Sequence, residues 1–186
     1  MRIISGKLKG KSISFIKTAT TRPLKDSVKE NIFNIIKHSN LIDIRLEKSK
    51  ILDLYSGIGS FGIECISRGA REVSFVEQDR NAAKILEDNL IKLSIQKKVN
   101  IFFNSVEDML EKNKRKKFNI FFLDPPFSDK KYMENLGFIK NNKMYEKKHI
   151  LIIHREKNTR DNFENKISVI REKNYGRSNI TFGVFK

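Results

Sequence analysis

The sequence has few of the side chains that build disulfide frameworks and metal centres. Its 186 residues include one cysteine, Cys65, and three histidines that lie far apart, His38, His149 and His154. A disulfide framework and a cysteine-based zinc cluster are therefore excluded, and we expect no bound metal. We expect Cys65 to pack on the apolar face of a helix. His154 closes a strand and could line a cleft, but we expect a packed or solvated role.

Long hydrophobic runs are also missing, although 39% of the residues are hydrophobic. No stretch reaches the roughly 20 apolar residues that a membrane-spanning helix needs. We therefore expect a monomeric protein of the reducing cytoplasm with no membrane partner.

Acidic residues are scarce relative to basic ones, 22 against 38, which gives a formal net charge of +16. Such an excess predicts a polyanionic partner, in particular a nucleic acid. A Lys- and Asn-rich composition also arises from A/T-rich coding, but that bias predicts nothing about position. The N-terminal stretch is the informative part, because it contains eight basic residues and only two acidic ones, Asp26 and Glu30. These basic residues are Arg2, Lys7, Lys9, Lys11, Lys17, Arg22, Lys25 and Lys29.

Apolar blocks of strand length alternate with helical patterns. The predicted strands are Ile51–Leu54, Glu72–Glu77, Val99–Phe103, Phe118–Leu123, Ile150–His154, Ile167–Arg171 and Ile180–Phe185. The predicted helices are Lys25–Lys37, Ser60–Ser67, Arg80–Leu93 and Val106–Lys112. This alternation predicts an α/β fold whose parallel sheet is covered on both faces, while the last two strands predict an antiparallel edge hairpin.

No internal repeat and no flexible linker divides the chain. Residues 2–16 alternate loosely around Gly6 and Gly10, which predicts a small basic hairpin and not a core strand. We therefore expect one domain over residues 1–186, with a basic extension over residues 1–22 and an α/β core over residues 23–186.

The first predicted core strand runs into a glycine-rich turn that contains Gly57 and Gly59. In sheets of this kind, ligands bind beyond the carboxyl ends of the strands, and glycines let the backbone approach them closely. Asp53 at the strand end can fix the loop or reach a cationic amine. Glu77 ends the next strand, where a carboxylate can accept from both ribose hydroxyls. The following strand ends near Ser105, from which an adenine edge can be reached.

Two cofactors fit this turn. Gly57, Gly59 and Gly62 satisfy the dinucleotide fingerprint, so NAD is one alternative. S-adenosylmethionine has no phosphate and prefers carboxylates near its ammonium and sulfonium groups, so Asp53, four residues before Gly57, favours it. A tight turn without any ligand is disfavoured by the presence of both acids. The candidate cofactor-binding residues are Asp53, Ser56, Gly57, Gly59, Glu77, Gln78, Ser105 and Asp124.

A second motif, Asp124-Pro125-Pro126-Phe127, follows an apolar strand. The carboxylate of Asp124 and the carbonyl of Pro125 can accept the two N–H bonds of an exocyclic amino group, and the prolines hold that carbonyl rigidly. Phe127 offers a face on which a base can stack. Taken alone, an ordinary strand end followed by a proline turn explains the motif equally well. Its place after the glycine loop in a basic chain favours methyl transfer to an unstacked base, with Asp124, Pro125 and Phe127 as catalytic residues.

The N-terminal sequence narrows this interpretation. It contains Arg2-Ile3-Ile4-Ser5-Gly6, Leu8-Lys9-Gly10, Arg22-Pro23 and Val28-Lys29-Glu30-Asn31-Ile32-Phe33-Asn34. Further along the chain come the glycine loop, Ser67-Arg68-Gly69-Ala70, Val76-Glu77, the Asp-Pro-Pro-Phe motif and Tyr175-Gly176. Over nearly its whole length the chain thereby resembles the RsmD family, the bacterial guanine-N2 methyltransferases of 16S ribosomal RNA.

The resemblance implies the class I S-adenosylmethionine-dependent methyltransferase fold, Rossmann-like with a mostly parallel seven-stranded sheet. It also implies methylation of guanine N2 in 16S ribosomal RNA, within the small ribosomal subunit or a late assembly intermediate. The residues expected to contact RNA are Arg2, Lys7, Lys9, Lys11 and Arg22. The chain departs from the common pattern at Ser105, where many methyltransferases carry an adenine-binding acid, and Asp108 lies further along.

Three other functions compete with this one. A DNA adenine-N6 or cytosine-N4 methyltransferase uses the same chemistry, although no target-recognition domain is evident. A protein-glutamine methyltransferase is disfavoured by the basic surface. A non-catalytic RNA-binding assembly factor is disfavoured by the intact acids Asp53, Glu77 and Asp124.

Overall fold

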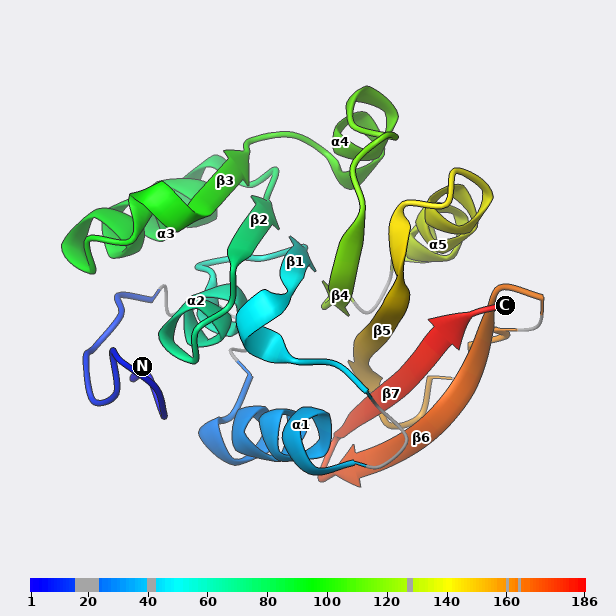
Figure 1. Ribbon diagram of the computed structural model, residues 1–186, viewed down its shortest axis with the longest axis horizontal. Helices are drawn as coiled ribbons and strands as arrows, with labels where there is room; N and C mark the ends of the chain where they lie inside the picture. Colours follow the sequence, from blue (N-terminus) through cyan, green and yellow to red (C-terminus); the bar gives the residue numbers. More distant parts are fainter. Residues whose placement is uncertain (16–23, 40–42, 127–128, 160, 164) are drawn as a thin grey trace.

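The computed structural model describes residues 1–15, 24–39, 43–126, 129–159, 161–163 and 165–186. A seven-stranded sheet in the order β3-β2-β1-β4-β5-β7-β6 forms its centre (Figure 1). The strands are β1 Lys50–Leu54, β2 Glu72–Val76, β3 Val99–Phe102, β4 Phe118–Leu123, β5 Tyr145–Glu156, β6 Ile167–Tyr175 and β7 Ser178–Phe185. The helices are α1 Asp26–His38, α2 Ser60–Ser67, α3 Arg80–Lys92, α4 Val106–Lys112 and α5 Tyr132–Asn141, with short 3-10 turns at Leu46–Lys48 and Gln96–Lys98.

Strands β1 to β5 are parallel to their neighbours, and β7 is antiparallel to both β5 and β6. The predicted parallel sheet with an antiparallel edge hairpin is therefore confirmed. The hairpin needs no crossover helix because antiparallel strands can be joined by the short turn that follows Tyr175.

Helices cover both faces of the sheet, because alternate residues of each buried strand point to opposite sides. One face packs against α1, α2 and α3 in an apolar cluster that includes Ile51, Phe75 and Phe122. The other face packs against α4 and α5 through Leu52, Phe121 and their neighbours. Helix α1 buries Val28, Ile32, Phe33 and Ile36.

The N-terminal segment forms a hairpin-like loop that lies against α2 and α3. A single antiparallel bridge joins Arg2 to Ser12, and Ile3 and Ile13 are buried in the α1–α3 cluster. The carboxylate of Glu64 on α2 accepts from the main-chain N–H groups of Ile4 and Ser5, each at 2.9 Å. This contact fixes the loop on the core.

Glu64 also lies at the centre of a buried charge network. It is fully buried, and its carboxylate is 2.8 Å from Nε of Arg68 and 3.9 Å from Nζ of Lys29. Lys29 is itself 1% exposed, and this burial lowers its pKa. The negative charge of Glu64 and the positive charge of Lys29 therefore lie inside an apolar cluster, where each stabilises the other.

The largest differences from the sequence prediction are one missed helix and two strands that are longer than predicted, β5 and β6, the latter ending at Tyr175 and not at Arg171. Helix α5 was not predicted, although Tyr132, Leu136 and Ile139 have helical spacing and are all fully buried. Strand β5 is 12 residues long and begins at Tyr145, whereas the sequence predicted a start at Ile150. Its first half is charged and partly exposed, which hides the strand from a hydrophobicity pattern.

No helix in the described part of the chain is long and apolar enough to cross a membrane. The described residues also contain no group of three or more His, Cys, Asp or Glu side chains that could hold a metal ion.

Candidate functional site

The candidate site lies where the strand order reverses. Strands β1 and β4 are neighbours in the sheet, and their last residues Leu54 and Leu123 pair with each other. The chain leaves β1 toward α2 on one face and leaves β4 toward α5 on the other face. A crevice at the carboxyl ends is expected at such a point, and the glycine loop and the Asp-Pro-Pro motif meet there. The main-chain N–H of Asp124 donates to the carbonyl of Leu54 at 3.4 Å.

The loop after β1 uses backbone conformations that favour glycine. Gly57 and Gly59 have φ values of 54° and 82°. A Cβ on Gly59 would lie 2.4 Å from a methyl carbon of Leu86, so Gly59 allows the loop to pack on α3. A Cβ on Gly57 would meet no atom within 4 Å, so the backbone there borders open space where a ligand can approach it.

Asp53 holds this loop from inside the protein. Its side chain is 1% exposed, and its Oδ2 accepts from the N–H of Gly62 in α2 at 2.9 Å. Burial raises the pKa of Asp53 well above its usual range, and the nearby negative charges of Asp124 and Glu77 raise it further. Of the two roles that the sequence left open, the structure therefore contains the loop-fixing contact.

Glu77 joins the loops that follow β1 and β2. Its Oε2 accepts from the N–H of Gly57 at 2.7 Å, and its Oε1 accepts from the N–H of Asp79 at 2.8 Å. Ser56 supports the same junction, because its hydroxyl donates to the carbonyl of Val76 at 3.1 Å. Gln78 lies exposed in the turn between Glu77 and Asp79.

Ser105 has a structural contact at the start of α4. Its hydroxyl oxygen accepts from the N–H of Asp108 at 3.1 Å, so Ser105 is the N-cap of this helix. The side chain lies beyond the end of β3, at the same edge of the sheet as Glu77, because β2 and β3 are parallel.

The carboxylate of Asp124 is positioned by a residue that the sequence analysis did not assign to the site. Its Oδ1 lies 2.8 Å from Nδ1 of His154, and Nε2 of His154 lies 2.9 Å from the hydroxyl of Ser178. The His154 side chain is 7% exposed and that of Asp124 is 28% exposed. Of the packed and solvated roles expected for His154, the packed one is found, and His154 also orients the partly exposed carboxylate of Asp124.

Arg155 supports the prolines in the same way. Its Nη1 donates to the carbonyl of Pro126 at 3.1 Å and, at 3.4 Å, to that of Pro125. Its Nε pairs with Asp161 at 3.3 Å, and its guanidinium lies 4.7 Å from the centre of the Tyr132 ring. The sequence did contain a signal for His154 and Arg155, because they are two adjacent polar residues at the end of an apolar strand. When such residues are buried, they must find polar partners.

A further polar contact connects both helices of the second face to the glycine loop. Asn135 of α5 is 4% exposed and donates to the hydroxyl of Tyr55 at 3.1 Å and to Glu107 of α4 at 2.8 Å. Tyr55 has a φ of 59°, so this contact helps to hold a backbone conformation that is rare outside glycine. Asn135 thus ties the start of the glycine loop to both α4 and α5.

The basic candidates of the N-terminus lie on the hairpin-like loop. Arg2, Lys7, Lys9 and Lys11 are all exposed. Phe127 and Arg22, which the sequence assigned to base stacking and RNA contact, lie outside the described residues.

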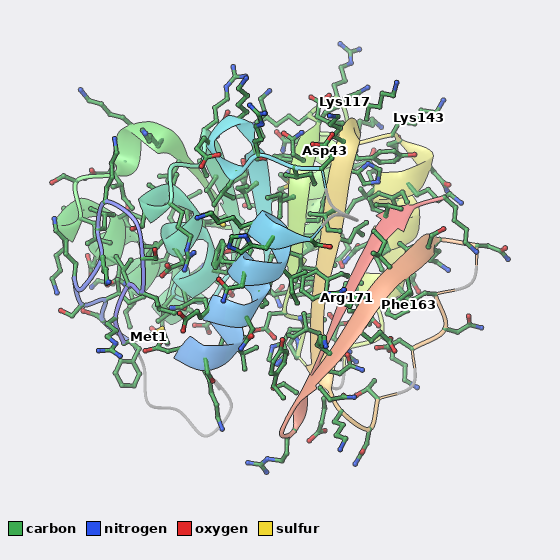
Figure 2. All side chains as sticks on the ribbon, turned by 60° about the horizontal axis from the view of Figure 1, so that its bottom comes forward. Met1, Asp43, Lys117, Lys143, Phe163 and Arg171 are labelled. Atoms are coloured by element: carbon green, nitrogen blue, oxygen red, sulfur yellow. The ribbon has the colours of Figure 1, made fainter. Side chains whose placement is uncertain are left out.

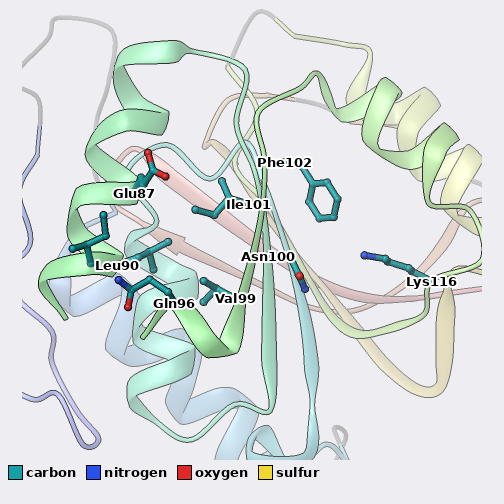
Figure 3. A pocket seen from close by; sticks show the side chains of 9 residues that line it. Glu87, Leu90, Gln96, Val99, Asn100, Ile101, Phe102 and Lys116 are labelled. Carbon is teal, nitrogen blue, oxygen red and sulfur yellow. The ribbon is translucent and has the colours of Figure 1, made fainter. Parts of the chain in front are cut away.

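A hollow of about 620 Å³ lies elsewhere, against the edge strand β3 (Figure 3). Its lining includes Leu90, Asn100, Phe102 and Lys116, and none of the predicted site residues. The candidate site residues therefore lie around the ends of β1 and β4 and not in this hollow.

Two partly exposed carboxyl groups, those of Glu77 and Asp124, lie beside the glycine loop, while Asp53 is buried beneath it. These two acids fit S-adenosylmethionine, which carries a sulfonium and an ammonium group, because carboxylates stabilise nearby cations. A dinucleotide would instead place its pyrophosphate near these acids, which like-charge repulsion disfavours.

Comparisons with known proteins show which family the chain belongs to. The family described as Conserved hypothetical protein 95 matches residues 1–184. The chain is 36% identical over 160 residues to ribosomal RNA small subunit methyltransferase D of Buchnera aphidicola, which covers 86% of this chain and 77% of that one. It is 35% identical over 148 residues to YlbH of Bacillus subtilis, provisionally named an rRNA methyltransferase, which covers 78% and 77% of the two chains.

A solved structure of yhhF from Escherichia coli, provisionally named a methyltransferase, has the same fold with a TM-score of 0.82. It is 24% identical and covers 100% of this chain and 98% of that one. The class I methyltransferase fold predicted from the sequence is thereby confirmed. By its match over residues 1–184 and its curated relatives, the chain belongs to the Conserved hypothetical protein 95 family, the RsmD family that its sequence resembled.

Proposed function

We propose that this protein methylates the exocyclic N2 of a guanine in 16S ribosomal RNA, within the small ribosomal subunit or a late assembly intermediate. The observation that carries the proposal is the braced carboxylate of Asp124, which lies beside the loop that fits S-adenosylmethionine. The names of the curated relatives support ribosomal RNA as the substrate class.

On the cofactor side, the acids and the glycine loop have different roles in binding S-adenosylmethionine. Glu77 has lone pairs beyond those that accept from Gly57 and Asp79, and these can accept from the ribose hydroxyls. Gly57 brings main-chain groups close to the ligand, while Asp53 keeps the loop in place. When bound, S-adenosylmethionine supplies a methyl group that is activated by its positive sulfur.

On the acceptor side, the protein has to position a weak nucleophile. The lone pair of a base amino group is delocalised into the ring, so acceptors for its N–H bonds help to aim it. Asp124 supplies one acceptor with the oxygen that does not contact His154. The carbonyl of Pro125 supplies the second, since its contact with Arg155 is long, at 3.4 Å, and occupies one lone pair. The proton lost from nitrogen passes to the carboxylate or to water.

The exposed basic side chains of the N-terminal loop, Arg2, Lys7, Lys9 and Lys11, bind RNA phosphates in this proposal. Their loop is fixed on α2 by Glu64, so it presents these charges on a rigid base. Rigid presentation lowers the entropy cost of binding.

The test is methyl transfer from labelled S-adenosylmethionine to undermethylated small ribosomal subunits, followed by nucleoside analysis. We expect the label in N2-methylguanosine. Label in N6-methyladenosine would be consistent with the mechanism but would contradict guanine N2 as the acceptor. Cofactor binding without any labelling of RNA would contradict the small ribosomal subunit as the substrate. Absence of cofactor binding would favour a non-catalytic assembly factor.

The variant Asp124→Ala tests the role of Asp124 in methyl transfer separately from cofactor binding. We expect turnover to fall at least about 10²-fold, because the acceptor for the amino group is lost, while S-adenosylmethionine binds nearly as before. Turnover equal to that of the wild type would refute the acceptor role of Asp124. Calorimetric titration of the cofactor gives the binding constant independently of turnover.

A further inference from the structure

Basic side chains also gather at the edge of the sheet opposite the candidate site. Each of the five parallel strands has an exposed Lys or Arg one or two residues before its first residue. In the order of the strands across the sheet these are Lys98, Arg71, Lys48, Lys117 and Lys143. We call these five residues the strand-start row.

The parallel arrangement explains why residues so far apart in sequence form a row. Parallel strands begin at the same edge, and neighbouring strands are about 4.8 Å apart, so five strand starts span about 19 Å. Figure 2 shows Lys117 and Lys143 together at one end of the strands, near Asp43. The row crosses β3, β2, β1, β4 and β5 without a break.

The surroundings of the row carry more than half of the excess charge of the chain. Around the row there are 14 basic and 5 acidic residues, which gives a formal charge of +9 out of the total of +16. The segments counted are residues 43–50, 71–72, 96–98, 111–117 and 142–148. Several of the acids already have partners, because Asp43 pairs with Lys148 and Glu111 pairs with Lys114. Within the described residues, no member of the row forms an ion pair with an acid.

Such a row matches a phosphate backbone. Exposed lysines and arginines contact phosphates without reading sequence, and the release of counterions drives the binding. Strands of five or six residues separate the row from the candidate site by about 17–20 Å. A nucleotide that enters the site therefore lies too far away to place its own phosphates on the row.

We propose that the strand-start row binds the phosphate backbone of a second RNA segment, distinct from the one that supplies the methylated base. This inference rests on the proposed function and deepens it, because only a large folded RNA can offer both segments at once. It gives a physical reason for a substrate of the size of a ribosomal subunit.

The test compares two variants that lose the same charge. The row variant is Arg71→Gln/Lys98→Gln/Lys117→Gln, and the control is Lys84→Gln/Arg171→Gln/Lys173→Gln, whose three residues are exposed and lie outside the row. Binding to undermethylated small ribosomal subunits is measured over a salt series. We expect the slope of log K against log salt to become shallower by about 2–3 in the row variant, at about 0.7–0.9 per phosphate contact.

Turnover and stability separate this effect from others. In the row variant we expect a higher KM for subunits with unchanged kcat, unchanged binding of S-adenosylmethionine and an unchanged melting temperature. Equal losses in both triple variants would mean that only net charge matters and would overturn the row as a site. Failure of the wild type to bind or methylate subunits would instead contradict the proposed function, and with it the second contact.

Discussion

At the scale of the residue, the site depends on side chains that orient other side chains. Asp124 and the two prolines are braced by His154 and Arg155, which are consecutive residues of β5. In our proposal neither touches the substrate, so both are positioning residues. A carboxylate with one oxygen already engaged presents the other in a defined direction, which lowers the cost of aligning an amino group.

Replacing His154 by Phe keeps the ring volume and removes both hydrogen bonds. We expect kcat to fall about 10- to 100-fold, because the carboxylate of Asp124 becomes free to rotate. The affinity for S-adenosylmethionine should stay the same, and His154→Gln, which can still donate to Asp124, should retain more activity. Steady-state kinetics on small ribosomal subunits measures this, and full turnover in the Phe variant would show that Asp124 needs no brace.

The buried carboxyl of Asp53 predicts a dependence of stability on pH. Its pKa is higher in the folded protein than in the unfolded chain, chiefly because of burial. Its contribution is therefore most favourable below the unfolded value of about 3.9 and is lost as the pH rises through the folded value. We expect Asp53→Asn to gain melting temperature relative to the wild type as the pH rises from about 4 to about 8. A difference that does not change with pH would contradict this.

At the scale of the element, α2 serves as the attachment site of the N-terminal loop. One carboxylate, that of Glu64, contacts the backbone of residues 4 and 5, the guanidinium of Arg68 and the ammonium of Lys29. The loop, α1 and α2 are thus held together by one charge. Close packing supports the attachment, since a Cβ on Gly6 would lie 2.0 Å from the carbonyl oxygen of Ser67.

Glu64→Ala should therefore destabilise the whole fold. Loss of one partner of a buried ion pair costs about 3–5 kcal/mol, because buried Lys29 then keeps only the partly exposed carboxylate of Asp26, at 3.8 Å, as an acidic partner. For a chain of this size that corresponds to a fall of about 6–20 °C in melting temperature. The control is Glu111→Ala, which removes an exposed pair with Lys114 and should change the stability by less than about 0.5 kcal/mol. Equal melting temperatures for the two variants would rule out the network as a structural centre.

The elements that the sequence predicted well are those with a single dominant signal. The short buried strands β1, β2 and β4 are continuous apolar runs, and α1 has a clear apolar face. Helix α5 was missed because Gly137 and a nearly neutral pattern weaken its signal, and only contacts with β4 and β5 explain its burial. The first half of β5 was missed because it is mostly polar, and within it only Tyr145 pairs with β4, opposite Phe118.

At the scale of the whole molecule, a few acids at the ends of β1, β2 and β4 lie within a strongly basic protein. The acids around the glycine loop suit a cationic cofactor, while the surface charge suits a polyanion, so two ligands of opposite charge are bound without competing for one set of groups. The glycine loop and its acids were predictable from local sequence. The strand-start row was not, because strand order alone brings residues 71, 98 and 117 to one edge.

Ligand binding to the native state should stabilise the molecule in a way that identifies the cofactor. At about 100 times its dissociation constant, S-adenosylmethionine should add about 2.7 kcal/mol, or about 5–11 °C in melting temperature. NAD at the same concentration should add nothing, and Glu77→Gln should reduce the shift produced by S-adenosylmethionine. A thermal melt monitored by circular dichroism measures all three, and a shift with NAD would favour the dinucleotide.

The attachment of the N-terminal loop through Glu64 also limits how the protein can change over evolution. The loop carries exposed lysines on one side, and on the other it supplies two N–H donors to a carboxylate inside the core. Deleting residues 1–15 would leave that carboxylate and Lys29 in an apolar cluster with fewer partners. Selection for folding therefore preserves the backbone of the loop whatever its lysines bind. The exposed side chains of the loop are free to change by substitution, while the segment itself is held by its contacts with the core.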